Sequence, residues 1–393
     1  MIGLTKLLSG TATVSEAIKY GSQGRSSHQP VDLLQFSSNK QPIVVWNITN
    51  RCNLSCRHCY LNAQDKDYQG ELSFKQAKTF ILDLAKMKIP VLLFSGGEPL
   101  IRADLFRLAR LACEKGLRTV LSTNGILINK AIAREIKEAG FQYVGVSIDG
   151  VQPTHDTFRN LPGAFSKAMQ GMRNCLSAKI KTGVRFTVTK YNYKDLPRII
   201  DLVVAEGITR FCIYHLVCTG RGKEIADADL SLEQKRRMIN FLIEKALQLR
   251  ARKVKLEILT VDNHADAVYL SHYVKDHIPE RAEEVRELLK MQGGCSAGER
   301  IANVDPQGAV HPCQFWPELT LGNVKERPLS EIWNDESNKF LQKLRCKSRY
   351  LKGRCRDCAY NEICAGCRVR ARAKTGDIWS EDPGCYLKDA EIK

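Results

Sequence analysis

This sequence predicts an α/β protein in which parallel strands alternate with helices and a cysteine-rich segment follows. Short apolar runs alternate with stretches of helical spacing from about residue 43 to residue 214. Ten of the fifteen cysteines form two groups: three lie within eight residues near position 52, and seven lie between Cys295 and Cys385, with Cys346 set apart. The 393 residues, of which 44% are hydrophobic, are enough for a full core and two or three domains.

Six short apolar runs predict the strands, and each fits a buried parallel strand. They lie at 43–48, 91–94, 118–121, 143–148, 184–188 and 210–214. The first helix between them begins with a capping box, Ser73 and Gln76. Further helices are predicted near 102–115, 129–139, 164–178 and 194–206. A run of such units builds a barrel or a doubly wound sheet, and in both the chemistry lies at the carboxyl ends of the strands.

The composition divides the chain into four segments. Longer and more charged helices are predicted near 231–250 and 281–291, and after Gly293 and Gly294 the sequence turns to Cys, Gly and short irregular pieces. We therefore expect an N-terminal extension and linker at 1–40, a core of strands and helices at 41–225, a helical connection at 226–290 and a cysteine-rich domain at 291–393.

Hydropathy and charge limit the surroundings of the protein. No run approaches the roughly 18 apolar residues of a membrane span, and the first residues lack the features of a signal peptide. We expect a cytoplasmic protein without a membrane partner, whose cysteines do not form disulfides. The net charge is +17, but the basic residues are spread along the whole chain. This spread favours a solvated surface or an anionic substrate over a nucleic acid.

Cys52, Cys56 and Cys59 form a C-x3-C-x2-C triplet directly after the first predicted strand. Three thiolates on a tight loop can hold three irons of a [4Fe–4S] cluster and leave the fourth iron open. A zinc site or three unrelated thiols are the alternatives, although structural zinc normally takes four protein ligands. The spacing favours the cluster.

Glycine and polar residues follow the next three predicted strands. Gly96 and Gly97 allow close approach of the backbone, and Glu98 can accept a hydrogen bond from an ammonium group. The third strand ends in Ser122–Gly125 and the fourth in Ser147–Gly150. Each of these could be an ordinary turn, but together they favour a ligand site.

These motifs resemble the radical S-adenosylmethionine (SAM) superfamily over about residues 43–220. The resemblance implies a partial (β/α)6 barrel, and SAM bound through its amino and carboxylate groups to the open iron. Reductive cleavage of SAM would yield a 5′-deoxyadenosyl radical that abstracts a hydrogen atom from the substrate. His58 stands where the family often has an aromatic residue, and its ring is expected to pack against the adenine. The implied SAM contacts are His58, Gly96, Gly97, Glu98, Ser122, Asn124, Ser147 and Asp149.

The C-terminal cysteines resemble the SPASM extension of radical SAM enzymes, which carries auxiliary [4Fe–4S] clusters. The resemblance implies one complete set formed by Cys355, Cys358, Cys364 and Cys385. It also implies the remnant of a second set, formed by Cys295, Cys313 and Cys367. Two residues rather than the usual three separate Cys364 from Cys367, and no further cysteine follows shortly after Cys295. We expect at least one auxiliary cluster; a structural zinc ribbon is the alternative, because CxxC spacing is shared.

Several stretches resemble the haem-synthesis branch of the family: Ile2–Leu8, Trp46–Cys52, Tyr214–Leu216 and Gly220–Gly222. The resemblance implies an enzyme of the oxidoreductase or lyase type that removes two acetate side chains from 12,18-didecarboxysirohaem, or one that acts in haem d1 formation. The partners would be an anionic tetrapyrrole substrate, which suits the positive charge, and an electron donor of the flavodoxin or ferredoxin type.

His215 and Arg221, beyond the last predicted barrel strand, are the candidates for facing the substrate. An imidazole could ligate iron and a guanidinium could pair with a propionate, or both residues could merely close the mouth of the barrel.

Two other functions fit the same sequence. A SPASM-type enzyme could modify peptides or proteins, although residues 1–40 look too short for a folded peptide-recognition module. A basic zinc protein that docks RNA would contain zinc rather than iron and would not cleave SAM.

Overall fold

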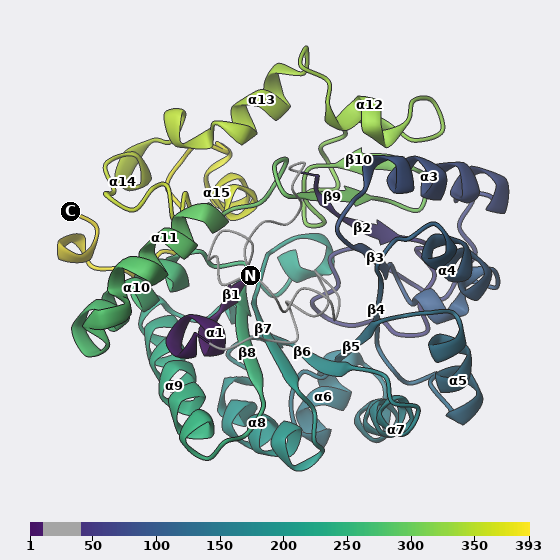
Figure 1. The fold of residues 1–393 in the computed structure, drawn as a ribbon, viewed down its shortest axis with the longest axis horizontal. Helices are drawn as coiled ribbons and strands as arrows, with labels where there is room; N and C mark the ends of the chain where they lie inside the picture. The colour runs from purple at the N-terminus through teal and green to yellow at the C-terminus, as the bar shows by residue number, and fades with distance from the viewer. Residues whose placement is uncertain (11–40) are drawn as a thin grey trace.

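The computed structural model describes residues 1–10 and 41–393 (Figure 1). Most of the expected N-terminal extension and linker, residues 11–40, lies outside the described residues. Among the helices that are described, none is long and apolar enough to cross a membrane.

Six parallel strands that follow one another in chain order form the centre of the sheet, as expected for the partial barrel. They are β2 (Ile43–Asn47), β3 (Leu92–Ser95), β4 (Thr119–Thr123), β5 (Tyr143–Ser147), β6 (Thr182–Val188) and β7 (Arg210–His215). The helices on the outside of the arc are α3 (Phe74–Met87), α4 (Leu105–Glu114), α5 (Lys130–Glu138), α6 (Gln152–Arg159), α7 (Ala164–Ser177) and α8 (Leu196–Ala205) (Figure 1). The arrangement confirms the predicted alternation.

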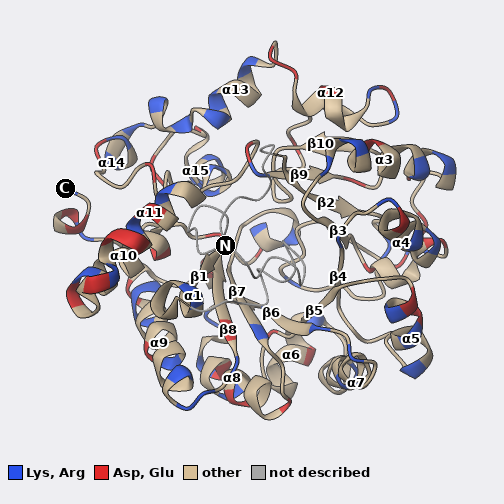
Figure 2. Ribbon diagram, viewed as in Figure 1, with Lys and Arg blue, Asp and Glu red and all other residues tan. Residues whose placement is uncertain are grey.

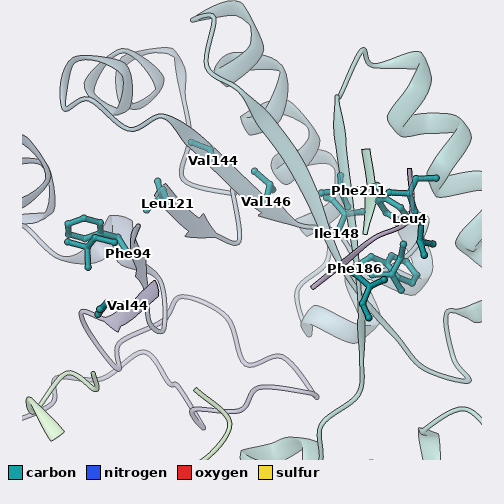
Figure 3. Close-up of a cluster of buried hydrophobic side chains, with 14 of the residues drawn as sticks. Leu4, Val44, Phe94, Leu121, Val144, Val146, Ile148, Phe186 and Phe211 are labelled. Atoms are coloured by element: carbon teal, nitrogen blue, oxygen red, sulfur yellow. The ribbon is translucent and has the colours of Figure 1, made fainter. Parts of the chain in front are cut away.

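Side chains that alternate along the strands separate the helix-facing core from the interior of the arc. The helix-facing positions are buried, and they include Val44, Phe94, Leu121, Val144, Val146, Phe186 and Phe211 (Figure 3). Tyr143 and Arg185 occupy the opposite face of their strands and line the interior. The core is therefore built outside the arc, which leaves its inner face for the site.

The capping box is present at the start of α3. The Ser73 hydroxyl accepts a hydrogen bond from the Gln76 backbone N–H, and the Gln76 side chain accepts one from the backbone N–H of Ser73. Behind this cap, Ala77, Phe80, Ile81 and Leu84 are buried at helical spacing. The local pattern alone is enough to place this helix.

The expected helical connection at 226–290 requires a correction, because it also contains a strand. Between α9 (Leu232–Ala251) and the helices α10 (Ala265–His277) and α11 (Ala282–Gln292) lies β8 (Glu257–Val261), which pairs in parallel with β7. Charged residues obscure its apolar pattern, and the carboxylate of Glu257 is buried 3.4 Å from Arg210 on β7. The pairing across the sheet gives this buried carboxylate a positively charged neighbour.

Both ends of the chain extend the same sheet. β1 (Ile2–Gly3) pairs antiparallel with β8, and the following helix α1 (Leu4–Ser9) buries three leucines. On the other side, β9 (Ile301–Val304) pairs in parallel with β2 and is followed by β10 (Ala309–His311) and β11 (Gly322–Asn323). We expected a domain boundary near residue 290. Strand β9 lies beyond that boundary but belongs to the same sheet, because it pairs with the edge of β2.

Short helices in the upper part of Figure 1 complete the C-terminal region. They are α12 (Leu329–Trp333), α13 (Lys339–Arg345), α14 (Gly353–Arg356) and α15 (Arg368–Thr375). Lysine and arginine are distributed over the helices around the sheet rather than gathered in one arm (Figure 2).

Candidate active site

A cavity at the carboxyl ends of the strands brings together most of the predicted site residues. We call it the cysteine-loop cavity, because Cys52, Cys56 and Cys59 line it. Six of the eight expected SAM contacts also line it: His58, Gly96, Gly97, Ser122, Asn124 and Ser147. Glu98 and Asp149 are fully buried behind its wall. Loops that lie far apart in the sequence therefore form one site.

The cysteine loop after β2 is fixed by a second loop that follows β7. The backbone N–H of Arg221 donates to the Cys59 carbonyl, and its guanidinium donates to the carbonyls of Cys56 and Ala63, each at 2.9 Å. Gly220 allows this approach, because a Cβ there would lie 2.4 Å from the Cys59 carbonyl oxygen. Arg221 was a candidate for facing the substrate. These bonds direct two of its guanidinium nitrogens to the loop that carries the triplet, while the buried Nη2 has no hydrogen-bond partner among the described residues.

Gly96 and Gly97 pack against the backbone that leads into the triplet. The Gly97 N–H donates to the Thr49 carbonyl at 2.7 Å, and the Glu98 N–H donates to the Arg51 carbonyl at 2.9 Å. A Cβ on Gly97 would lie 2.2 Å from the Arg51 carbonyl oxygen. Both glycines are needed because two stretches of backbone touch here.

Replacing Gly97 with alanine is expected to displace the cysteine loop and to lower SAM cleavage by roughly a hundredfold, the cost of misplacing reacting groups by about 1 Å. The measurement is 5′-deoxyadenosine formation, together with iron content. Gly207→Ala is the control, since a Cβ at Gly207 meets nothing within 4 Å. The control incurs only the left-handed backbone strain, about 1–2 kcal/mol. Equal SAM cleavage by both variants would contradict the packing argument.

Glu98 connects the ends of two strands instead of lining the cavity. Its carboxylate accepts hydrogen bonds from the Thr123 hydroxyl at 2.7 Å, the Asn124 N–H at 2.8 Å and the Leu100 N–H at 3.1 Å. Burial raises the pKa of Glu98 to about 7. The carboxylate expected to meet an ammonium group is thus already bonded within the protein, and it holds Asn124 in place at the cavity wall.

Asp149 likewise acts through a neighbour, Arg159 of α6. The Asp149 carboxylate forms a buried ion pair with Arg159, and the Arg159 guanidinium lies 3.5 Å from the Cys56 sulfur. Burial alone would raise the pKa of Asp149, but Arg159 and His58 hold it below its ordinary value. Arg159 lines the cavity and was not identified from the sequence, because nothing local relates a helix residue to the cysteine loop.

His58 stacks on Phe158 with ring centroids 4.6 Å apart and planes 10° apart. Burial lowers the pKa of His58 to about 4, so the ring is neutral near pH 7. A flat neutral ring at the cavity wall is consistent with the expected contact to an adenine.

His215 lines the same cavity at the end of β7. Its Nε2 lies 3.0 Å from an Asp266 carboxylate oxygen, and the other oxygen of Asp266 accepts a hydrogen bond from the Tyr386 hydroxyl at 2.7 Å. The buried Nδ1 of His215 has no hydrogen-bond partner among the described residues. Asp266 thus orients the imidazole and leaves one nitrogen unbonded.

A second cavity, which we call the interior cavity, adjoins the first inside the arc. Apolar side chains from the strands form much of its wall, including Val45, Leu93 and Val120. Cys295, Cys313 and Cys367 line it as well, so the structure brings the predicted second set together. This set faces the inside of the barrel.

The predicted complete auxiliary set surrounds a third cavity, with all four thiols in its wall. The sulfurs of Cys358, Cys364 and Cys355 each accept a backbone N–H at 3.4 Å, from Tyr360, Gly366 and Asp382 in that order. The sulfur of Cys385 accepts from the Arg354 guanidinium at 3.2 Å. Hydrogen bonds to the sulfurs stabilise thiolates and tune the potential of a cluster, so this donor set suits a [4Fe–4S] cluster.

Across residues 1–10 and 41–393, no three His, Cys, Asp or Glu side chains are close enough to hold a single metal ion. Four thiolates around a cavity match a [4Fe–4S] cluster, which takes four cysteine ligands.

Comparison with known families agrees with the fold and with the presence of iron–sulfur domains. Residues 46–203 match the radical SAM superfamily, and residues 295–359 match SPASM, an iron–sulfur cluster-binding domain. The chain belongs to the radical SAM superfamily. Its cofactors are therefore SAM and the [4Fe–4S] cluster of the radical SAM domain, together with auxiliary iron–sulfur clusters in the SPASM region.

Individual relatives place the chain within this superfamily. It is 48% identical to Fe-coproporphyrin III synthase from Methanosarcina barkeri (strain Fusaro / DSM 804), and the match covers 100% of this chain and 99% of that protein. It is 44% identical to pre-heme d1 synthase from Dinoroseobacter shibae, over 89% of this chain and 87% of the relative. Among solved structures, Streptococcus suis SuiB bound to S-adenosylmethionine has a TM-score of 0.69 at 18% identity, covering 88% of this chain and 78% of SuiB. This last likeness shows the fold alone.

Proposed function

We propose that this chain removes two acetate side chains from 12,18-didecarboxysirohaem to give Fe-coproporphyrin III, as a radical SAM enzyme of haem synthesis. The full-length identity of 48% with Fe-coproporphyrin III synthase carries this proposal. The adjoining cavities support it, because one holds the residues expected at SAM and the other offers an apolar interior beside them.

Within this proposal, the cysteine triplet holds the cluster that supplies the electron for SAM cleavage. The expected contacts that line the cavity hold SAM, and Arg159 adds a cation near Cys56. Cys355, Cys358, Cys364 and Cys385 hold the auxiliary cluster. The apolar walls of the interior cavity suit the face of a tetrapyrrole and exclude water from the reacting side chain.

The remaining partner in the proposal is an electron donor of the flavodoxin or ferredoxin type. The net charge of +17 and the distribution of basic residues over the helices favour an acidic partner protein (Figure 2).

The test incubates the anaerobically reconstituted, reduced enzyme with SAM and 12,18-didecarboxysirohaem and identifies the tetrapyrrole by mass. We expect the loss of two acetate units together with 5′-deoxyadenosine formation. A product of the haem d1 type would instead align the chain with its relative at 44% identity. An unchanged pigment beside active SAM cleavage would refute both assignments.

A further inference from the structure

The cysteine-loop cavity and the interior cavity share part of their walls. Five residues line both: Arg185, Tyr214, Asp262, Gln314 and Phe315. We call this shared wall the junction. A group of a molecule in the interior cavity that reaches across this shared wall toward the cysteine loop meets these residues.

Arg185 brings to the junction a positive charge that forms no ion pair with the residues that the structure describes. It lies on β6 and its guanidinium carbon is 4.6 Å from the centroid of the Tyr214 ring. Among the residues that the structure describes, no carboxylate lies within 4.0 Å of its nitrogens. By contrast, Arg159 is paired with Asp149, and Arg210 lies 3.4 Å from Glu257.

A guanidinium that lines a cavity without a carboxylate partner is poorly compensated unless a ligand supplies the opposite charge. The Tyr214 ring offsets part of this cost and fixes the plane of the guanidinium, since a cation over an aromatic face is attracted to it. The planar donor fork of arginine matches a carboxylate in a bidentate fashion. The junction thus has the chemistry of a carboxylate receptor.

Asp262 is the carboxyl group that shares the junction with Arg185: burial raises its pKa to about 6, and the charge of Arg185 is one of several that act against this rise. The residue follows β8 with a left-handed φ of 70°, and its carbonyl accepts a hydrogen bond from Arg370 at 2.5 Å. Its buried Oδ2 has no hydrogen-bond partner among the described residues. Held in this conformation, the carboxyl group shares the junction with Arg185 but does not pair with it.

We propose that Arg185 binds the carboxylate of the substrate side chain at the junction and thereby presents the adjacent carbon to SAM. The inference rests on the proposed function, because it requires a substrate whose side chains carry carboxylates. In an acetate group the carbon to be presented is the methylene next to the carboxylate. Arg185 is therefore a binding residue that selects which side chain reaches the reaction, and Tyr214 is its positioning residue.

The experiment measures binding of 12,18-didecarboxysirohaem and of its fully methyl-esterified form by absorbance titration, without reductant. Arg185→Gln is expected to weaken binding of the free acid by roughly 10- to 100-fold, the range for a charge-assisted hydrogen bond. Binding of the ester should be the same for both proteins, because it lacks the carboxylate. Arg185→Lys should recover part of the difference, since it keeps the charge but not the fork.

Arg237→Gln on the exposed face of α9 is the matched control for loss of one positive charge and should bind like the wild type. Iron content and SAM affinity equal to those of the wild type show that Arg185→Gln is folded. A loss of SAM affinity with unchanged tetrapyrrole affinity would overturn the proposal, because Arg185 would then serve the SAM carboxylate.

The wild type alone gives a second test that does not depend on a folded variant. It should bind the free acid more tightly than the ester, and equal affinities would refute the inference. If the wild type converts the tetrapyrrole but Arg185→Gln binds both forms like the wild type, only the role of Arg185 fails. If the wild type neither binds nor converts the tetrapyrrole, the proposed function fails as well.

Discussion

Replacing Cys56 with alanine is expected to abolish cleavage of SAM. Cys56 is the central ligand of the triplet, and its buried sulfur lies 3.5 Å from the Arg159 guanidinium. Two thiolates cannot hold three irons of a [4Fe–4S] cluster, so the variant should lose one cluster per chain. The measurements are 5′-deoxyadenosine by chromatography, and iron and sulfide per chain.

The control for this prediction is Cys346→Ala. Cys346 is exposed and lines none of the three cavities described above. The Cys346→Ala variant should keep the iron content and the SAM cleavage of the wild type. SAM cleavage at the wild-type rate by Cys56→Ala would show that the triplet does not hold the cluster.

Replacing Cys364 with alanine is expected to remove the auxiliary cluster and to stop tetrapyrrole conversion while SAM cleavage remains. Cys364 is buried in the wall of the third cavity, and its sulfur accepts a hydrogen bond from the Gly366 N–H. Because cluster binding contributes to folding free energy, the midpoint of thermal unfolding should also fall. Iron content, the unfolding midpoint and product mass measure the three effects.

Cys367→Ala separates this cluster from the second set. Cys367 lies only three residues further along but lines the interior cavity with Cys295 and Cys313. The Cys367→Ala variant should keep the iron bound by the set formed by Cys355, Cys358, Cys364 and Cys385. If Cys364→Ala keeps all of the iron of the wild type, the assignment of the auxiliary ligands is wrong.

The elements that the sequence predicted well are those with a complete local signal. The six parallel strands are continuous apolar runs, and α3 carries both its cap and its buried face within 14 residues. The triplet was accessible as a motif, because its three cysteines stand in one short stretch after the first strand. The C-terminal set was implied only by the resemblance to the SPASM extension, since Cys385 lies well beyond the other three cysteines in the chain.

The strand β8 and the roles of single charges were not accessible in the same way. Glu257 looks unfavourable in a buried strand until Arg210 on β7 is placed 3.4 Å away. Arg221 looks like a ligand for an anion, yet its guanidinium is bonded to the cysteine loop.

The sequence by itself determined the alternation of strands and helices and the position of the triplet, since each depends on neighbours a few residues apart. Only the tertiary structure decided which charges are already paired: Arg159 with Asp149, Arg210 with Glu257, and Arg185 with no carboxylate among the described residues. The physical reason is that pairing depends on distances between strands and loops far apart in the chain. Burial then determines whether a charge without a partner must find one in a ligand.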